Sequence, residues 1–416
     1  MKRKVSKFIF LFIFLFCTSG LLFAQQKNLN DYIQSAIKFS PVFADNQNQL
    51  QSLALDSLLV RAGLKPQIGF VSNDMYAPVV NGYGYDDAIT NGANVNALLG
   101  IKYLFNGKRN LSNQFGALNI QKEILAINLK LTERDLKQSV SQQYITVYGE
   151  QLALKNAEEL IALLGKEETI LKQLTQSAVY AQTDYLTFLV NYNQQKLNYA
   201  QQLLQSKNDF YTLNYLCGIA DTTYLNLPLP EISLTENYSV TQSISFQKFV
   251  YDSLRIENSL QKIQFNYKPK LSLLGDAGYN SSLAVHPEKN FGASVGLNFS
   301  VPIYDGRQRN LQQQKFSLEQ NSNQNSRNYF VSQYNIRKAQ LKNQIAATEK
   351  LLNDSQAQLE LTKTLMHANE QLLITSDLRI ADYLLAVYNF ISAQSTVSQL
   401  HADKLQLINQ YNFFIQ

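Results

Sequence analysis

The positions of proline and glycine constrain this chain more than any other feature. No proline occurs between Pro78 and Pro228 or after Pro302, and no glycine occurs after Gly306. Both residues interrupt or weaken helices, so their absence over about 110 C-terminal residues predicts one very long helical stretch, broken at most by a hairpin. We therefore expect a mainly α-helical protein with helices far longer than those of ordinary globular domains.

Apolar residues in these stretches recur at the spacing of a coiled coil. One set follows intervals of four and three and a second recurs every seven residues: Ile120, Ile124, Ile127 and Leu131; Ile345, Leu352, Leu359, Met366 and Leu373. This pattern indicates a coiled-coil seam. An ordinary packing stripe explains it equally well, so the seam bears on architecture and not on function.

Two other segments alternate with period two, as β-strands do. They run from Asn94 to Phe105 and from Phe291 to Tyr304, and each has one apolar face and one small or polar face. A weaker strand pattern precedes each, from Pro66 to Tyr76 and from Pro269 to Tyr279, which predicts two hairpins. Strands of about ten residues with this alternation suit a barrel whose outer face contacts lipid, although a sandwich core alternates too.

The N-terminal residues 1–24 have the pattern of a secretory signal. Four basic residues precede an apolar run from Phe8 to Phe16, and Ala24 stands at the expected cleavage point. A retained anchor is the alternative, but it needs about 20 apolar residues, and this run is broken from Cys17 onward. Lipidation of Cys17 is not favoured because the large Phe16 precedes it.

Removal of this segment changes the charge balance. The whole chain has 37 basic and 32 acidic residues, and four of the basic ones lie in the signal, which leaves 33 against 32. This near neutrality gives no reason to expect nucleic acid or anionic lipid as a partner. Only Cys217 remains as a cysteine, so no disulfide is expected within one mature chain.

The hairpins and the helices after them recur in the same order along the chain. Three pairs of landmarks keep nearly the same spacing of about 200 residues: Pro66 and Pro269, Gly107 and Gly306, and Asp184 and Asp382. Duplication is expected, with a first repeat over residues 25–215, a connector over 216–235 and a second repeat over 236–416. The strand pairs occupy about 66–105 and 269–304, and the long helices about 107–215 and 306–416.

This order of elements resembles the outer-membrane efflux protein family, which includes the TolC-like channels. The segment Val301 to Arg307 is similar to the family's strand end followed by an Asp/Asn-Gly turn, and Leu29 to Ile37 resembles its first helix. Leu213 to Gly218 resembles the end of its first half. The chain departs from the family in two places: the first hairpin lacks a proline equivalent to Pro302, and the turns between the long helices lack the glycine often found there.

The resemblance implies a fold class, which is mainly α with a membrane β-barrel. A long coiled-coil α-helical barrel would join a 12-stranded β-barrel to which each chain of a homotrimer gives four strands. Four strands alone cannot enclose a pore, and lipid does not tolerate open sheet edges. A helix from Arg109 to about Thr175 would reach on the order of 100 Å into the periplasm from the outer membrane.

The resemblance also implies a function, that of a passive exit duct in a tripartite efflux or type I secretion system. A periplasmic adaptor would join the duct to an inner-membrane transporter, which must supply energy because the sequence has no recognisable nucleotide-binding loop. No enzyme activity, cofactor or metal is expected, and the acidic residues on the helices are interpreted as solvated faces. The exported substrate stays open. The alternative is a structural coiled-coil or adhesin-like envelope protein without a continuous pore.

The turns near residues 176–183 and 375–381 are predicted to form the periplasmic end. Asp184 and Asp382 match the acidic residue that the family often has after each turn, and Asp377 lies nearby. Acidic rings there would favour cations, although an Asp at a helix start also stabilises the helix itself. Arg379 is expected to pair with one of these carboxylates and to hold the aperture closed. The candidates for contact with the adaptor are Ala178, Val179, Tyr180, Ser376 and Leu378.

Overall fold

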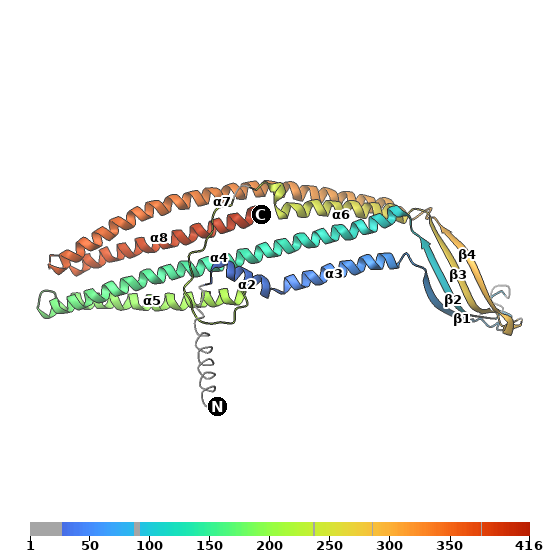
Figure 1. Cartoon of the computed structure of the whole chain (residues 1–416), viewed down its shortest axis with the longest axis horizontal. Coiled ribbons are helices and arrows are strands. Elements are labelled where there is room, and N and C mark those ends of the chain that lie inside the picture. The colour runs from blue at the N-terminus through green and yellow to red at the C-terminus, as the bar shows by residue number, and fades with distance from the viewer. Residues whose placement is uncertain (1–26, 87–91, 236–237, 285, 376) are drawn as a thin grey trace, which may run out of the picture. The chain divides into compact units, whose positions relative to one another are not determined.

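A computed structural model describes residues 27–86, 92–235, 238–284, 286–375 and 377–416 (Figure 1). The predicted signal over residues 1–24 and the candidate Ser376 lie outside these residues. The described chain begins with the helices α2 (Leu29–Phe39) and α3 (Pro41–Ala62), the strands β1 (Gln67–Tyr76) and β2 (Ala93–Phe105), and the helices α4 (Lys108–Gln176) and α5 (Gln182–Leu216).

The elements after the connector follow a similar order. They are η1 (Val240–Gln242), α6 (Ile244–Asn266), β3 (Lys270–Ser281), η2 (Pro287–Lys289), β4 (Phe291–Ser300), α7 (Gln308–Ile374) and α8 (Ile380–Ile415). Two helices precede the first strand pair, because the helical stretch there is divided at Ser40 and Pro41. Proline is tolerated in a first turn but not in a helix interior, so α3 begins where α2 ends.

The long helices predicted from the proline and glycine pattern are present. Helix α4 has 69 residues and α7 has 67, and α5 and α8 have 35 and 36. Glycine does occur within α4, where it permits close packing. A Cβ on Gly149 would lie 2.9 Å from the Ala402 Cβ of α8, and one on Gly165 would lie 2.9 Å from the Tyr192 hydroxyl oxygen of α5. These glycines bring neighbouring helices together instead of ending α4.

The four strands form one antiparallel sheet in the order β1-β2-β3-β4. The two predicted hairpins are confirmed, and the sheet joins them through β2 and β3, which pair from Val95 opposite Ser281 to Phe105 opposite Leu271. No helix among the described residues is both long and apolar enough to cross a membrane.

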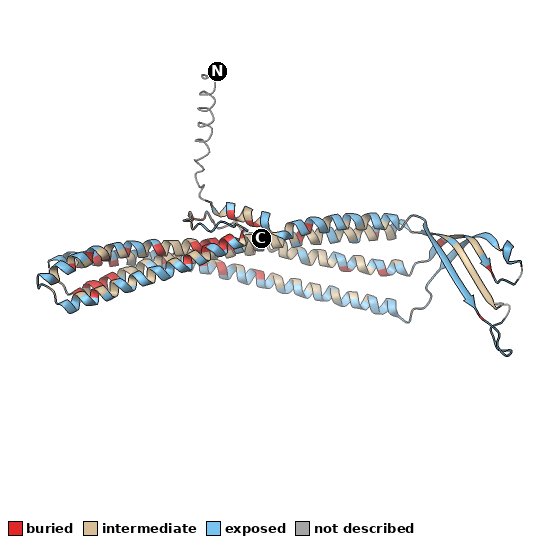
Figure 2. Ribbon diagram, turned by 90° about the horizontal axis from the view of Figure 1, so that it is seen from below, coloured by how far each residue is buried: buried red, intermediate tan, exposed pale blue. Residues whose placement is uncertain are grey.

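The register of this sheet places most of its large apolar residues on one face, while Val71, Leu98 and Leu274 lie on the other. Ile68 lies opposite Ile101, and Phe105 lies opposite Leu271, which in turn lies opposite Phe299. In the single chain this face has no cover, because β1 and β4 are exposed at every residue (Figure 2). We call it the apolar sheet face.

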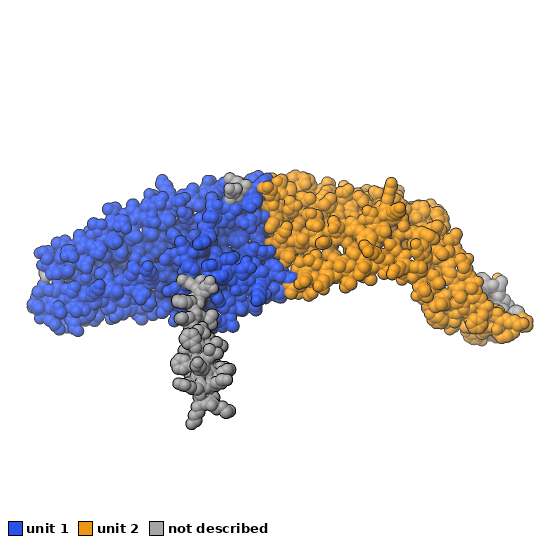
Figure 3. All heavy atoms as spheres, viewed as in Figure 1, with its two compact units in different colours: residues 1–43, 132–240, 333–416 blue, residues 44–131, 241–332 orange. Residues whose placement is uncertain are grey.

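The chain divides into two compact units (Figure 3). One comprises residues 44–131 and 241–332 and contains the sheet, α6, nearly all of α3, and parts of α4 and α7. In it, Asn113 and Asn258 exchange side-chain amide to backbone carbonyl hydrogen bonds of 3.0 Å, which fasten α4 to α6.

The other unit comprises residues 1–43, 132–240 and 333–416. One of its apolar clusters gathers around Tyr32, Tyr144, Phe210 and Cys217. The predicted seam of α7 also lies in this unit, where Ile345, Leu352, Met366 and Leu373 are buried and Leu359 is half-buried. Burial along this seven-residue repeat confirms the coiled-coil interpretation.

Candidate functional site

The two predicted turns lie in the same unit and share one apolar core. We call the ends of α4 and α7, the starts of α5 and α8 and the turns between them the helical tip. Its core is a cluster of buried side chains from all four helices: Leu160, Leu164, Leu171, Phe188, Met366, Leu373, Ile380, Tyr383, Leu384 and Val387. The candidate residues on the turns are therefore held by a packed support.

The first turn closes without the glycine that helix ends usually carry. Ala178 takes a left-handed backbone conformation with φ of 58°, and its N–H donates to the Thr175 carbonyl at 3.0 Å. The Val179 N–H donates to the Leu174 carbonyl at 2.9 Å, as in a glycine-terminated helix. Ala178 therefore forms the same turn that glycine would form, but the left-handed conformation has a higher free energy for alanine than for glycine.

Asp184 and Asp382 occupy equivalent positions, each at the third residue of its helix. Neither preceding cap residue, Ala181 or Arg379, makes a side-chain capping bond. The Asp184 side chain is exposed, and no ion pair involves it among the described residues. A carboxylate at this position interacts favourably with the helix dipole.

Arg379 pairs with Asp382 within the first turn of α8. Its Nε lies 2.8 Å from Asp382 Oδ2 and its Nη2 lies 3.0 Å from Oδ1, a two-point contact. The pair therefore neutralises Asp382 locally, whereas Asp184 keeps its charge. Asp377 is exposed on the second turn, where its N–H donates to the Leu372 carbonyl at 2.9 Å.

Tyr180 connects the two turns. Its hydroxyl donates to the Leu378 carbonyl at 2.9 Å and lies 3.2 Å from the Leu373 carbonyl. Tyr180 and Leu378 both pack against the tip core. Ala178 and Val179 are exposed, Val179 by 47%. Of the described adaptor candidates, these two are therefore the ones whose side chains are open to a partner.

The tip core also contains acidic residues that sequence reasoning missed. Glu167 is only 2% exposed, and one of its carboxylate oxygens has no hydrogen-bond partner among the described residues. Burial, followed by the charge of Glu370 and a hydrogen bond with it, raises the pKa of Glu167 to about 7. Burial and both carboxylates also raise the pKa of Tyr383.

The interpretation of the helix acids as solvated faces is therefore wrong for Glu167. A signal was present in the sequence, since Leu160, Leu164, Glu167 and Leu171 follow the four-and-three spacing of a buried stripe. Glu370 holds the same place between Met366 and Leu373. It is partly exposed, with a side-chain exposure of 23%, and its Oε2 lies 3.1 Å from Nδ1 of His367.

Solved structures with a similar architecture are all outer-membrane proteins or channels in the three comparisons that follow. The outer membrane protein VceC from Vibrio cholerae superposes with a TM-score of 0.74 at 13% identity, covering 93% of this chain and 95% of that one. The outer-membrane channel OprN gives a TM-score of 0.76 at 13% identity, covering 93% and 89%. The Campylobacter jejuni CmeC outer membrane channel gives 0.73 at 13% identity, covering 94% and 85%. This chain has the fold of the TolC-like outer-membrane channels.

The TolC-like fold is thus established by structure and not by sequence. No protein-family model and no curated relative matches the sequence. With 13% identity, the shared architecture lies in the lengths and order of the elements. The helical tip and the apolar sheet face are therefore the features from which the function of this chain has to be argued.

Proposed function

We propose that this chain is the outer-membrane exit duct of a tripartite efflux or type I secretion system. Three copies would pool their strands into a membrane barrel and their long helices into a periplasmic tunnel. A periplasmic adaptor would contact the helical tip, and an inner-membrane transporter would supply the energy. The duct itself would be a passive conduit and not an enzyme.

The apolar sheet face is the observation that carries this proposal. Val295 is 82% exposed, Phe299 67% and Phe70 68% in the single chain, all on the same face. A continuous apolar surface of this kind is unfavourable in water and marks contact with a partner or a membrane. The opposite face carries Lys102, Asp276 and Asn298, which suit a wet lumen.

The open edges of the sheet favour an assembly of several copies. β1 and β4 each pair on one side only among the described strands, so each leaves a row of backbone donors and acceptors without partners. Unpaired backbone groups cost several kcal/mol each in lipid, which is why spanning sheets close into barrels. Pairing of β4 of one copy with β1 of the next removes these edges, and the shared fold favours three copies.

The helical tip supports the placement of an aperture at the far end of the tunnel. Asp184 and Asp377 carry carboxylates without a described ion-pair partner, so symmetric copies would surround the axis with negative charge. Such rings attract cations and oppose anions. The exposed Ala178 and Val179 offer an apolar contact to an adaptor at the same end.

Single-channel recording tests the duct against the pore-free structural alternative. The purified mature protein is added to planar lipid bilayers at low protein concentration, and current is recorded under a range of voltages and salt concentrations. The duct predicts discrete conductance steps. Absence of current under every condition, together with a protein that stays monomeric in detergent, would favour a structural envelope protein.

A further inference from the structure

Basic residues are concentrated where the sheet meets the helices. Each of the four strand-to-helix connections carries two, and together we call these eight residues the basic junction: Arg61, Lys65, Lys108, Arg109, Lys268, Lys270, Arg307 and Arg309. The connecting segments 61–67, 104–110, 265–271 and 301–310 contain one acid, Asp305. The mature chain is almost neutral overall, so this clustering is local and is invisible in the net charge.

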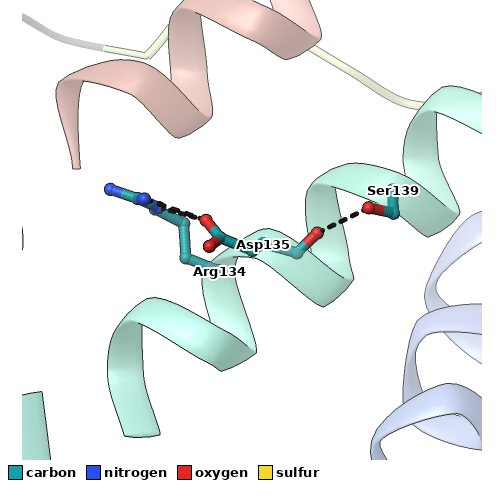
Figure 4. A network of polar contacts seen from close by, with 3 residues as sticks. All are labelled: Arg134, Asp135 and Ser139. Atoms are coloured by element: carbon teal, nitrogen blue, oxygen red, sulfur yellow. Dashed lines mark hydrogen bonds and ion pairs between the residues drawn. The ribbon is translucent and has the colours of Figure 1, made fainter. Parts of the chain in front are cut away.

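The cations of the basic junction are not neutralised within the chain. No ion pair among the described residues involves any of them. Arg134 on α4 shows the contrast, since its guanidinium lies 2.8 Å from the carboxylate of Asp135 (Figure 4). At the junction the one acid, Asp305, forms no ion pair with any of these cations among the described residues.

The single acid of the junction is satisfied by neutral donors. The Asp305 carboxylate accepts a hydrogen bond from the Tyr267 hydroxyl and one of 2.8 Å from the Arg309 backbone N–H, and these bonds lower its pKa. Asp305 therefore organises the turn before α7. It leaves the positive charge of the junction available to an external anion.

Two cavities lie at the junction, and cations line both. One of about 420 Å³ is lined by Lys108, Arg109, Lys268 and Lys270 beside Phe105, among others. A second, of about 270 Å³, is lined by Arg307 and Arg309 together with Tyr267, Ile303 and Tyr304, among others. The first cavity joins cationic groups to the apolar Phe105 and suits a ligand that is anionic at one end and apolar at the other. The second is more polar and also contains the Asp305 carboxylate.

We propose that the basic junction binds the phosphate groups of anionic phospholipids. The inference rests on the proposed function, because a membrane around the apolar sheet face brings the junction to the level of the periplasmic-leaflet headgroups. The strands end at Phe105, Lys270 and Ser300, and the cations follow within a few residues. Arginine and lysine form charge-assisted hydrogen bonds with phosphate oxygens, while acyl chains cover the adjacent apolar strands.

The charge at the opposite end of the sheet agrees with this placement. The described residues of the loop after β1 include Asp86, and those between β3 and β4 include Glu288 and Lys289. Positive charge is therefore concentrated at the helical end of the strands. The junction would fix the depth of the sheet in the membrane through contacts on one leaflet only.

Lipid titration with matched variants tests the site. The full mature protein in neutral detergent is titrated with phosphatidylglycerol, and bound lipid is counted by native mass spectrometry. The test variant combines Lys108→Gln, Arg109→Gln, Lys268→Gln and Lys270→Gln. The control carries the same loss of charge at exposed helix positions: Lys130→Gln, Lys172→Gln, Lys350→Gln and Lys363→Gln. The test variant should bind phosphatidylglycerol at least about tenfold more weakly, because it lacks four of the cations that attract the anionic headgroup.

Further results of this experiment distinguish a lipid site from a free-anion site, and failure of the lipid site from failure of the proposed duct. Equal binding by the test variant, or an equal loss in the control, would overturn the lipid site. Inorganic phosphate that displaces phosphatidylglycerol at millimolar concentration would identify a free-anion site instead. The wild-type protein could form channels in phosphatidylcholine bilayers and show no preference for phosphatidylglycerol. That result would support the proposed duct and contradict the lipid site. Failure to insert into any bilayer would contradict the duct and the site together.

Discussion

Glu167 is buried in the helical tip beside Glu370, so we expect the stability of the tip to depend on pH. Burial raises the pKa of Glu167 from 4.5 to about 7, and the charge of Glu370 adds to this effect. The folded state therefore binds this proton more tightly than the unfolded chain does. Below about pH 4.5 both states are protonated, and between about pH 4.5 and 7 the tip loses stability as the proton leaves. His367 contacts Glu370, and Tyr383 lies close enough to both carboxylates for their charge to raise its pKa.

Replacement of Glu167 by Gln should reduce this dependence. The wild type should lose on the order of 3 kcal/mol more stability than E167Q between pH 4.5 and 7.5. A slope should remain in E167Q, because burial also raises the pKa of Glu150 on α4 to about 8. The measurement is thermal unfolding followed by circular dichroism at each pH. Glu159→Gln, a change of the same type at an exposed position of α4, serves as the control. A slope as steep in E167Q as in the wild type would show that Glu167 does not titrate in this range.

Tyr180 fastens the first turn to the second through its hydroxyl. Replacement by Phe removes the hydroxyl donor that the Leu373 and Leu378 carbonyls share. The free energy that holds the two turns together should fall by about 1 kcal/mol. Hydrogen exchange of the amides of residues 377–384 should become faster. Tyr185→Phe is the matched control, because the Tyr185 hydroxyl bonds Glu168 within the first hairpin only. Equal acceleration in both variants would indicate general loosening of the tip.

The two equivalent aspartates should differ in their effect on ion selectivity. Asp382 is neutralised by Arg379, whereas Asp184 has no described counter-charge. Asp184→Asn should therefore reduce the preference for cations more than the joint replacement of Asp382 by Asn and Arg379 by Gln does, because the joint replacement leaves the net charge of the tip unchanged. Reversal potentials under a salt gradient measure this difference. If neither substitution changes the potential, both residues act only as helix-start residues.

At the scale of the element, the two faces of each strand should tolerate different substitutions, because one is proposed to contact lipid and the other the lumen. Val295 lies near the middle of β4 on the apolar sheet face, and Asn298 lies three residues later on the opposite face. Val295→Arg places a charge in lipid and should cost about 2–4 kcal/mol. Asn298→Arg faces the lumen and should be tolerated.

The assay for these strand variants is insertion into lipid vesicles, followed as resistance of the sheet to an added protease. V295R should insert poorly and N298R should insert as the wild type does. Equal insertion of both variants would show that the apolar sheet face does not contact lipid. The reverse order would show that the two faces are assigned the wrong way round.

The elements differ in how far the sequence determines them. The presence of very long helices follows from the absence of proline, a local constraint that needs no knowledge of the fold, but the ends of α4 at Gln176 and of α7 at Ile374 do not. The pairing of β2 with β3 is different, because it joins residues about 180 positions apart and no local pattern encodes it. The burial of Glu167 likewise depends on which helices surround it. Composition predicted that its side chain faces solvent, whereas in the structure the neighbouring helices bury it.

At the scale of the whole molecule, we expect the free edges of β1 and β4 to determine how copies of the proposed duct assemble. β1 runs away from the helices and β4 returns to them, so β4 of one copy can pair antiparallel with β1 of the next. An interface of this kind joins two different surfaces, and it gives either a closed ring or an open polymer. The shared fold favours a ring of three.

Disulfide scanning across these edges distinguishes the two assemblies. One cysteine is placed at Gly69, Val71 or Asn73 of β1 and a second at Ser294, Gly296 or Asn298 of β4, all on the face away from lipid. At least one pair should come within disulfide distance in a closed barrel, since paired strands hold opposite Cβ atoms about 5 Å apart. The native Cys217 does not interfere, because it is buried and burial raises the pKa of its thiol to about 12.

Oxidation of the double-cysteine protein in lipid should give a covalent trimer and nothing larger on a denaturing gel. A trimer is the largest product because closure of the ring uses every edge, whereas an open polymer adds copies without limit and gives a ladder. Variants with a cysteine on β1 or β4 alone should stay uncrosslinked, since each edge meets the other edge and not itself. A ladder of larger products would indicate an open polymer instead of a closed ring. If every cysteine pair gave only monomers, β1 and β4 of neighbouring copies would not pair.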